Sequence, residues 1–454
     1  MKKILIFTLS LVAAMQLLSE QLLDAKLFLP EEYKIIANDT FELFFDGIIM
    51  DIDPSDYEVR VEPPIGGLHY AHKFMWRPTA AQVGNHVVSI NLFDRSGTMI
   101  ETREIVLKVA PAIEVSPSKP VYILCIGDSL TADGEWILEL NRRLTDIGGA
   151  PEGRGLSNIN FVGRRKIPGT EVGHEGNSGW GYYNYADNFD YHHRFAVKVD
   201  SQEVLDNAYV GSGWRANNGT FWEIKAINRE EMLLYLGYYS RFGLPPERGT
   251  LTWQRGRAPD LGQIEFEVVK VISSNPFWNE ETKSIDIRNY VNNVAGAPQL
   301  DYCYIFLGWN HINTPPKDMM DGCNRLTALI REAYPECRIV QIGLQRPVRE
   351  AMGFDRNPLR VSYLSLLKWS FLDFQWKLSA ISKNHTNVDV LHLSGQVDST
   401  NHAQTAELKS DLRSPRAETV PSAVFHLSKS GYMQVADAVY RDLMYRLSTA
   451  AQQQ

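Results

Sequence analysis

The sequence predicts an α/β fold with a parallel sheet in a three-layer α/β/α arrangement, a small all-β domain before it, and a β-rich insertion within it. Apolar runs such as residues 121–126 (VYILCI) predict strands buried on both faces, and stretches with helical spacing follow them. Before residue 111 the pattern differs, because short alternating runs are separated by turn residues. A length of 454 residues fits two or three domains.

The first 25 residues have the pattern of an export signal. Lys2 and Lys3 precede an apolar run, Ile4 to Leu18, that is too short for a membrane-spanning helix. No cysteine follows for a lipid anchor, and no later segment is apolar enough to cross a bilayer. The alternative, a hydrophobic N-terminal core helix, is disfavoured by the two lysines. We therefore expect a protein exported to the periplasm, the cell surface or the surroundings of a bacterium.

Residues 26–110 predict a β-sandwich of immunoglobulin-like type. Runs such as FELFFDGI and HVVSINLFD alternate or are rich in aromatic residues, and turn signals such as Asp94–Gly97 separate them. Residues 111–120 (PAIEVSPSKP) contain prolines that stiffen the chain, which predicts a linker.

The α/β domain is expected to cover residues 121–450. Further strands are predicted at YCYIFLG, RIVQIGL and VDVLHLS, and the last helix at SKSGYMQVADAVYRDLMYRL. Between residues 189 and 277 this alternation is interrupted by strand-like runs joined by turns that contain glycine and proline. This stretch predicts the β-rich insertion.

Charge and cysteine content exclude several classes of function. A net charge of −8 offers no basic face for phosphates, so we expect no nucleic-acid partner. Cys125 and Cys303 lie within apolar runs and are expected to be free and buried, while a bridge between Cys323 and Cys337 is an alternative for the other two. The cysteine spacing suits no zinc site, and we expect no metal or cofactor.

Ser129 follows the run at residues 121–126, where a buried strand is predicted to give way to a helix. Ligands of open α/β sheets bind beyond the carboxyl ends of the strands, and a helix N-terminus offers free N–H groups. A nucleophile and an oxyanion site would fit there. An aspartate–serine pair before a helix is also an ordinary N-cap, and Gly-Asp-Ser alone favours the cap.

Four blocks of sequence change this reading when they are taken together. GDSLT at residues 127–131 resembles the first block of the SGNH (GDSL) hydrolase family, and HEGNSGWGY at 174–182 resembles the second. LGWNHI at 307–312 is similar to the third block, and the stretch that begins FHLSKSGY at residue 425 is similar to the last. The blocks occur in family order. The resemblance implies a flavodoxin-like SGNH-hydrolase domain with carboxylic-ester hydrolase activity.

The resemblance also implies catalytic roles. Ser129 would be the nucleophile and His426 the base that takes its proton. The oxyanion donors would be the backbone N–H groups of Ser129 and Gly179 and the side-chain amide of Asn310. Taken singly, each residue also has a structural interpretation: a turn asparagine, a loop glycine, or a histidine near a helix N-cap.

Four further residues are candidates for substrate contact. Asp128 is expected to position the loop rather than to take part in the chemistry. Trp180 and Trp309 are next to proposed oxyanion donors, where core packing and a sugar-stacking wall are competing interpretations. His311 occupies the position where the family often has an acid after Gly-x-Asn.

One position departs from the family pattern. The last block normally has an aspartate three residues before the histidine, and this chain has Ala423 there. The acid orients the imidazole, a role that a backbone carbonyl, Glu418 or Asp411 would have to take. We expect a Ser–His dyad, with a catalytically degenerate glycan-binding surface protein as the alternative.

The motif HEGNSGW resembles the carbohydrate-esterase branches of the family more closely than its lipases. An exported, acidic chain with 10 tryptophans and a β-domain also suits a glycan substrate. We therefore expect an acylated carbohydrate as the partner and acetyl as the first acyl group. A lipase, thioesterase or arylesterase of the same fold is the competing enzyme.

Overall fold

The computed structural model describes residues 26–452 except 114–115, 187–193, 209–212, 217–220, 239–247, 256–262, 273–274, 283, 312–315, 352–362 and 410–416. The predicted export signal and Asp411 lie outside the described residues. The chain forms two compact units: Met1–Trp180, Ala295–Met320 and Glu336–Gln454 make the first, and Gly181–Val294 with Asp321–Pro335 make the second. Within the described part, no helix is long and apolar enough to cross a membrane.

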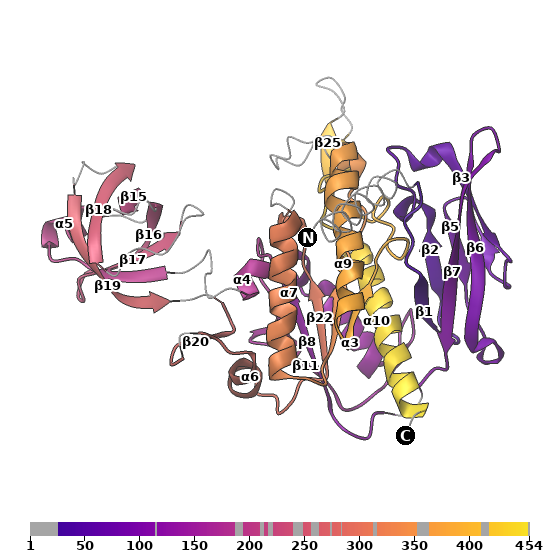
Figure 1. The fold of residues 1–454 in the computed structure, drawn as a ribbon, viewed down its shortest axis with the longest axis horizontal. Helices are drawn as coiled ribbons and strands as arrows, with labels where there is room; N and C mark the ends of the chain where they lie inside the picture. Colours follow the sequence, from indigo (N-terminus) through magenta and orange to yellow (C-terminus); the bar gives the residue numbers. More distant parts are fainter. Residues whose placement is uncertain are drawn as a thin grey trace, which may run out of the picture. The chain divides into compact units, whose positions relative to one another are not determined.

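The first unit begins with two small sheets, drawn in indigo and violet in Figure 1. One has the order β1-β7-β6-β3, with β1 parallel to β7 and the other pairs antiparallel. The other has the antiparallel order β2-β5-β4. The strands are β1 (Glu32–Ile36), β2 (Phe41–Phe44), β3 (Tyr57–Glu62), β4 (Leu68–His69), β5 (Lys73–Trp76), β6 (Gly84–Asp94) and β7 (Met99–Ala110).

Both small sheets contribute to one hydrophobic core. Its buried side chains include Ile35, Leu43, Trp76, Ile90 and Leu107, which come from five different strands. Alternating runs in the sequence place every second side chain in this core. The immunoglobulin-like topology and the limits of this domain stay predictions.

The central sheet of the first unit has the parallel order β11-β8-β22-β23-β24. In chain order this is 2-1-3-4-5, the doubly wound order of flavodoxin-like sheets, and the order reverses between β8 and β22. The strands are β8 (Val121–Gly127), β11 (Ile159–Val162), β22 (Tyr302–Phe306), β23 (Arg338–Ile342) and β24 (Val388–Leu391). This arrangement is compatible with an α/β hydrolase-like fold.

One edge of this sheet corrects the expectation of a wholly parallel sheet. Strand β13 (Gly173–Gly176) continues beside β8 where β11 ends, and β12 (Arg165–Lys166) pairs with β13 in the antiparallel direction. The connection between them covers only residues 167–172. Two parallel strands need a crossover connection of a dozen or more residues. The connection between β12 and β13 is shorter than that, so these strands can only form an antiparallel hairpin.

Helices of the first unit pack beside the sheet and against one another. Helix α3 (Glu135–Thr145) contacts α10 (Lys429–Gln452), and α9 (Asp373–Asn384) contacts β24. Helix α10 also contacts β1 and β7 of the N-terminal sheets. The three-layer arrangement stays a prediction. The other elements of this unit that concern the site are α2 (Ser129–Ala132), η5 (Trp309–His311), β25 (Thr405–Lys409) and β26 (Ala417–Pro421).

The second unit contains a closed barrel with the strand order β14-β17-β16-β15-β18-β19. Its strands are β14 (Arg194–Lys198), β15 (Gly213–Ala216), β16 (Phe221–Asn228), β17 (Leu233–Tyr238), β18 (Arg248–Arg255) and β19 (Gln263–Ile272). The barrel has its own core, which includes Trp214, Trp222 and Leu236. All six strands fall within residues 189–277.

All four cysteines are free and buried. The alternative of a bridge between Cys323 and Cys337 is therefore wrong. Burial raises the pKa of the Cys323 thiol to about 12, so this side chain is an un-ionised, apolar group.

Candidate active site

Ser129 follows the central strand β8 and begins helix α2. Asp128 caps this helix, since its Oδ1 accepts a hydrogen bond from the Leu130 N–H at 3.0 Å. A side chain at Gly127 would collide with Thr131, so glycine lets the helix begin directly after the strand. The serine lies where the strand order reverses, which is the usual ligand-binding position of such sheets. The Gly-Asp-Ser motif thus caps helix α2 with Asp128 and places Ser129 at the carboxyl end of strand β8.

The ring of His426 contacts Ser129, although 297 residues separate them in the chain, and 2.9 Å separates Nε2 from Oγ. With Nε2 unprotonated, the serine hydroxyl donates to it, which is the arrangement a base needs. Among the described residues this is the only hydrogen bond of the ring. Ala423 offers no side-chain acceptor, and Glu418 lies in β26 without a hydrogen bond to the ring.

Asn310 lies in η5, directly after β22, and its side chain connects three segments. Its Nδ2 donates to the Trp180 carbonyl at 2.9 Å and to Asp128 Oδ2 at 3.2 Å. An amide nitrogen carries two hydrogens, and both have acceptors here. Asn310 therefore lies at the site, and its role as an oxyanion donor stays a prediction. To donate to an oxyanion, the amide would have to give up one of these two hydrogen bonds.

Two of the predicted oxyanion donors are backbone N–H groups. Those of Ser129 and Gly179 make no hydrogen bond within the part of the chain that the structure describes. Gly179 has φ +79°, in the left-handed region, within the turn closed by the bond from the Trp180 N–H to the Asn177 carbonyl at 3.1 Å. The Asn177 N–H in turn donates to the carbonyl of Gly127 at the end of β8 at 2.9 Å. The Gly179 turn is thereby held next to the strand that carries Ser129.

A pocket of about 310 Å³ opens at Ser129. It brings together the predicted residues Ser129, His426, Asn310, Asp128 and Trp309. Gly179, Trp180 and His311 do not line it. The remaining lining residues are Leu130, Gln404, Ser422, Ala423 and Phe425.

The two tryptophans and His311 are buried, and their contact with substrate stays a prediction. Trp309 is 5% exposed and stacks on Phe425, with ring centroids 4.2 Å apart. Trp180 is equally buried. His311 is 7% exposed, and its backbone N–H donates to the Gly308 carbonyl. Burial of these side chains removes the broad exposed face that a sugar-stacking wall requires.

Three polar residues at the site were missed from the sequence. Gln404 and Ser422 line the pocket from the ends of the β25–β26 hairpin, where the Ser422 N–H donates to the Gln404 carbonyl at 2.8 Å. Gln345, after β23, is 1% exposed. Its Nε2 donates to the Phe425 carbonyl at 2.6 Å and its Oε1 accepts from Trp309 Nε1 at 3.3 Å. No periodicity marks such loop residues.

Burial controls the charge of Asp128, next to Ser129, and of His174 on β13. Asp128 is 1% exposed, and burial raises its pKa to about 7, against the opposing effect of its hydrogen bonds. His174 on β13 accepts a bond from the Gly176 N–H at Nδ1, and burial lowers its pKa to about 4. This histidine is neutral and fixes the strand before the Gly179 turn. The described residues contain no group of three or more His, Cys, Asp or Glu side chains that fits a metal ion.

No family model matches the sequence, and no curated protein matches it. Several solved structures are similar. A Clostridium thermocellum family 3 carbohydrate esterase is 16% identical, with 73% of this chain and 100% of that chain covered and a TM-score of 0.32. A family 3 carbohydrate esterase from Talaromyces cellulolyticus is 13% identical, with 73% and 99% covered and a TM-score of 0.33.

A third similar structure covers more of the chain. It is an active-site mutant of a family two carbohydrate esterase from Clostridium thermocellum, 9% identical, with 91% of this chain and 93% of that chain covered and a TM-score of 0.28. Identities and TM-scores this low transfer no activity to the present chain.

Proposed function

We propose that the protein is a serine esterase that removes small acyl groups, acetyl first, from carbohydrates. The observation that carries the proposal is the 2.9 Å contact between Ser129 Oγ and His426 Nε2 at a pocket beyond the central strand. A nucleophile in hydrogen-bond contact with a base is the requirement for covalent acyl transfer.

The reaction would proceed in two halves. Ser129 Oγ attacks the ester carbonyl carbon while its proton passes to His426 Nε2, and the carbonyl oxygen becomes an oxyanion. His426 then gives the proton to the departing sugar hydroxyl, and the carbon–oxygen bond to the sugar breaks. A water molecule gives a proton to His426 and attacks the acyl carbon. The bond to Ser129 Oγ then breaks, His426 returns the proton to that oxygen, and the carboxylic acid is released.

The oxyanion would be held by the Ser129 and Gly179 N–H groups and by Asn310. The Asn310 bond to Asp128 is the longer of its two bonds, at 3.2 Å against 2.9 Å, so this is the one that gives way as negative charge develops. Removing one such donor in other hydrolases costs about 10²–10³ in rate. The dyad would work without an orienting acid, since Ala423 stands at that position.

The choice of a small acyl group on a sugar has two supports. The pocket is about 310 Å³ and is lined in part by polar side chains, which disfavours a long acyl chain. The resemblance of HEGNSGW to carbohydrate esterases supports a carbohydrate as the substrate that carries the acyl group.

A fluorophosphonate probe tests the nucleophile. We expect one adduct, on Ser129, that disappears in Ser129→Ala and forms far more slowly in His426→Ala. Ser379, which also contacts a histidine, should stay unlabelled and serves as an internal control. Absence of an adduct on Ser129 in folded protein would reject the esterase and leave a degenerate binding scaffold.

The acyl group and the sugar need a second experiment. Rates for p-nitrophenyl acetate, butyrate and octanoate should fall with chain length, and acetylated xylan should release acetate. A preference for octanoate would favour the lipase alternative instead.

A further inference from the structure

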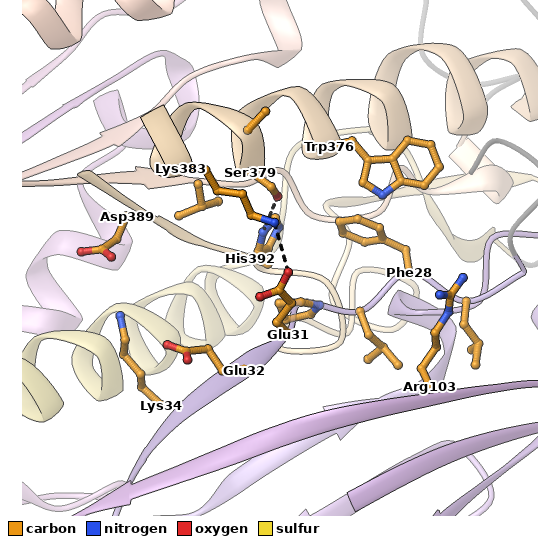
Figure 2. Close-up of a pocket in the computed structure, with 15 residues that line it drawn as sticks. Phe28, Glu31, Glu32, Lys34, Arg103, Trp376, Ser379, Lys383, Asp389 and His392 are labelled. Carbon is orange, nitrogen blue, oxygen red and sulfur yellow. Dashed lines mark hydrogen bonds and ion pairs between the residues drawn. The ribbon is translucent and has the colours of Figure 1, made fainter. Parts of the chain in front are cut away.

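A second pocket, of about 560 Å³, lies between residues 27–34, at the start of the N-terminal sheets, and helix α9 and strand β24 (Figure 2). It shares no lining residue with the pocket at Ser129. The volume is within the range of roughly 300–1,000 Å³ that ligand sites occupy. The side chains that carry the argument below are Phe28, Trp376 and His392 and six charged residues.

Aromatic rings form one side of this pocket. Trp376 on α9 is half-buried and packs edge-to-face on Phe28, with centroids 6.4 Å apart (Figure 2). Phe28 is 4% exposed and is itself held edge-to-face by His392 at 5.5 Å. Trp376 therefore has a fixed orientation and keeps part of its indole accessible in the pocket.

The charged residues of the pocket balance one another. Three are cationic and three anionic: Lys34, Arg103 and Lys383, and Glu31, Glu32 and Asp389. Each is held in an ion pair: Lys383 Nζ lies 3.2 Å from Glu31 Oε1 within the pocket (Figure 2), and the other four pair with side chains that do not line it. The pairs fix the side chains and leave lone pairs and N–H groups for other partners.

We propose that this pocket is a carbohydrate-binding site for a neutral glycan chain, separate from the site of ester hydrolysis. A sugar ring has an apolar face for the Trp376 indole and hydroxyl groups that both donate to carboxylates and accept from lysine and arginine. An acyl chain would have to desolvate six charges, and an ionic ligand would meet no net opposite charge. The equal number of both signs is what selects a neutral polar ligand.

The Ser379–His392 contact in this pocket does not make it a second active site. His392 Nε2 is 3.0 Å from Ser379 Oγ, but the hydroxyl also donates to the Gln375 carbonyl at 2.9 Å. Ser379 lies inside α9, where backbone N–H groups are used by the helix, so no oxyanion donors are available. The pocket binds and does not cleave.

Calorimetry with Ser129→Ala protein tests the proposal without turnover. Xylohexaose, cellohexaose and chitohexaose are the probes, and at least one should bind. Adding Trp376→Ala should weaken that binding about tenfold or more, while Trp376→Phe should keep most of it. Lys383→Ala should weaken binding about two- to fivefold. Lys377→Ala is the matched control, because Lys377 makes an exposed ion pair with Asp373 on the same helix outside the pocket.

The outcomes separate this proposal from the esterase proposal. Lack of binding to all three oligosaccharides, or binding that Trp376→Ala and Lys383→Ala leave unchanged, would overturn the glycan site. If Trp376→Ala fails to fold, Lys383→Ala and Glu31→Gln decide, since their side chains are 68% and 88% exposed. Hydrolysis of p-nitrophenyl acetate by the Lys383→Ala enzyme should match that of the unmodified enzyme, so loss of one function is visible without the other.

Discussion

Asn310 makes hydrogen bonds that its sequence motif does not predict. Its motif placed it correctly beyond β22, because a Gly-x-Asn after a buried strand must lie at the sheet edge. The sequence did not reveal that Asp128 and the Trp180 carbonyl accept both amide hydrogens. Such bonds depend on how separate loops meet in space, and one sequence carries no signal for them.

We expect Asn310→Ala to lower kcat by about 10²–10³ with a small change in KM, because the amide acts only as charge develops on the oxyanion. Steady-state kinetics on p-nitrophenyl acetate measures this. The control is Asn401→Ala, which removes a comparable bond, from Nδ2 to Asp398 Oδ2 at 2.8 Å, away from the pocket. An equal loss in both variants would point to a general loss of stability.

We expect the free energy of unfolding to depend on pH through Asp128. Burial raises its pKa to about 7, whereas an aspartate in an unfolded chain titrates near ~4. Between these values the folded state holds the proton and the unfolded state does not, so stability falls as pH rises through this window.

Asp128→Asn removes that titration. We expect the free energy of unfolding of the variant, relative to the unmodified protein, to increase from about pH 4 to about pH 7 by roughly 1.4 kcal/mol per unit and then to level off. Urea unfolding at a series of pH values gives this difference. A difference that does not change with pH would show that Asp128 is ionised throughout.

At the scale of elements, Gln345 joins the two loops that carry Asn310 and His426. Its side chain bonds Trp309 and the Phe425 carbonyl, each the residue immediately before one of them. The rings of Trp309 and Phe425 also stack, so one buried amide and one ring pair set the distance between these loops. Gln345 is a positioning residue, since it does not line the pocket.

Gln345→Leu should therefore reduce kcat by about 10- to 100-fold with little effect on KM, and should slow fluorophosphonate labelling of Ser129 by a similar factor. Gln375→Leu is a matched control, because Gln375 is also buried and donates to the Leu344 carbonyl at 2.6 Å. The positioning role is refuted if both variants lose melting temperature and activity in parallel.

The strands show which parts of the fold the sequence can predict. Apolar runs identified β8, β22 and β23, because a central parallel strand must be apolar on both faces, and the run VDVLHLS identified β24 at the edge. The edge pair β12–β13 was missed, since β12 has only two residues, both exposed, and so has no burial pattern. Edge strands need fewer apolar side chains and therefore leave a weaker signal.

At the scale of the molecule, a buried ion pair between Lys34 and Asp442 joins the N-terminal sheets to helix α10 of the α/β domain. Asp442 on α10 bonds Lys34 on β1 at 2.8 Å and Arg446 at 2.7 Å, and it accepts from Tyr304 at 3.0 Å. Burial favours the protonated form, but the charges of Arg446 and Lys34 outweigh it and hold the pKa of Asp442 well below its usual range. A linker alone would not tie the two regions together in this way.

Asp442→Asn should lower the free energy of unfolding at pH 7 by about 3–5 kcal/mol, because Lys34 loses its carboxylate partner and Arg446 keeps only Asp389. A lowered pKa gives stability that is present above about pH 4 and is lost as the pH falls towards the folded value, so the variant should differ less at pH 3. Urea unfolding at both pH values tests this. Asp373→Asn, which breaks the surface pair with Lys377, should cost less than about 1 kcal/mol.

The engaged amide of Asn310 has a consequence for which molecules the site prefers. A flat, uncharged ester competes poorly with the Asp128 carboxyl group and the Trp180 carbonyl for hydrogens that are already bonded. A tetrahedral anion competes well, so boronates should bind tightly while intact esters are held weakly. The resting hydrogen bonds would then favour the transition state over the bound substrate.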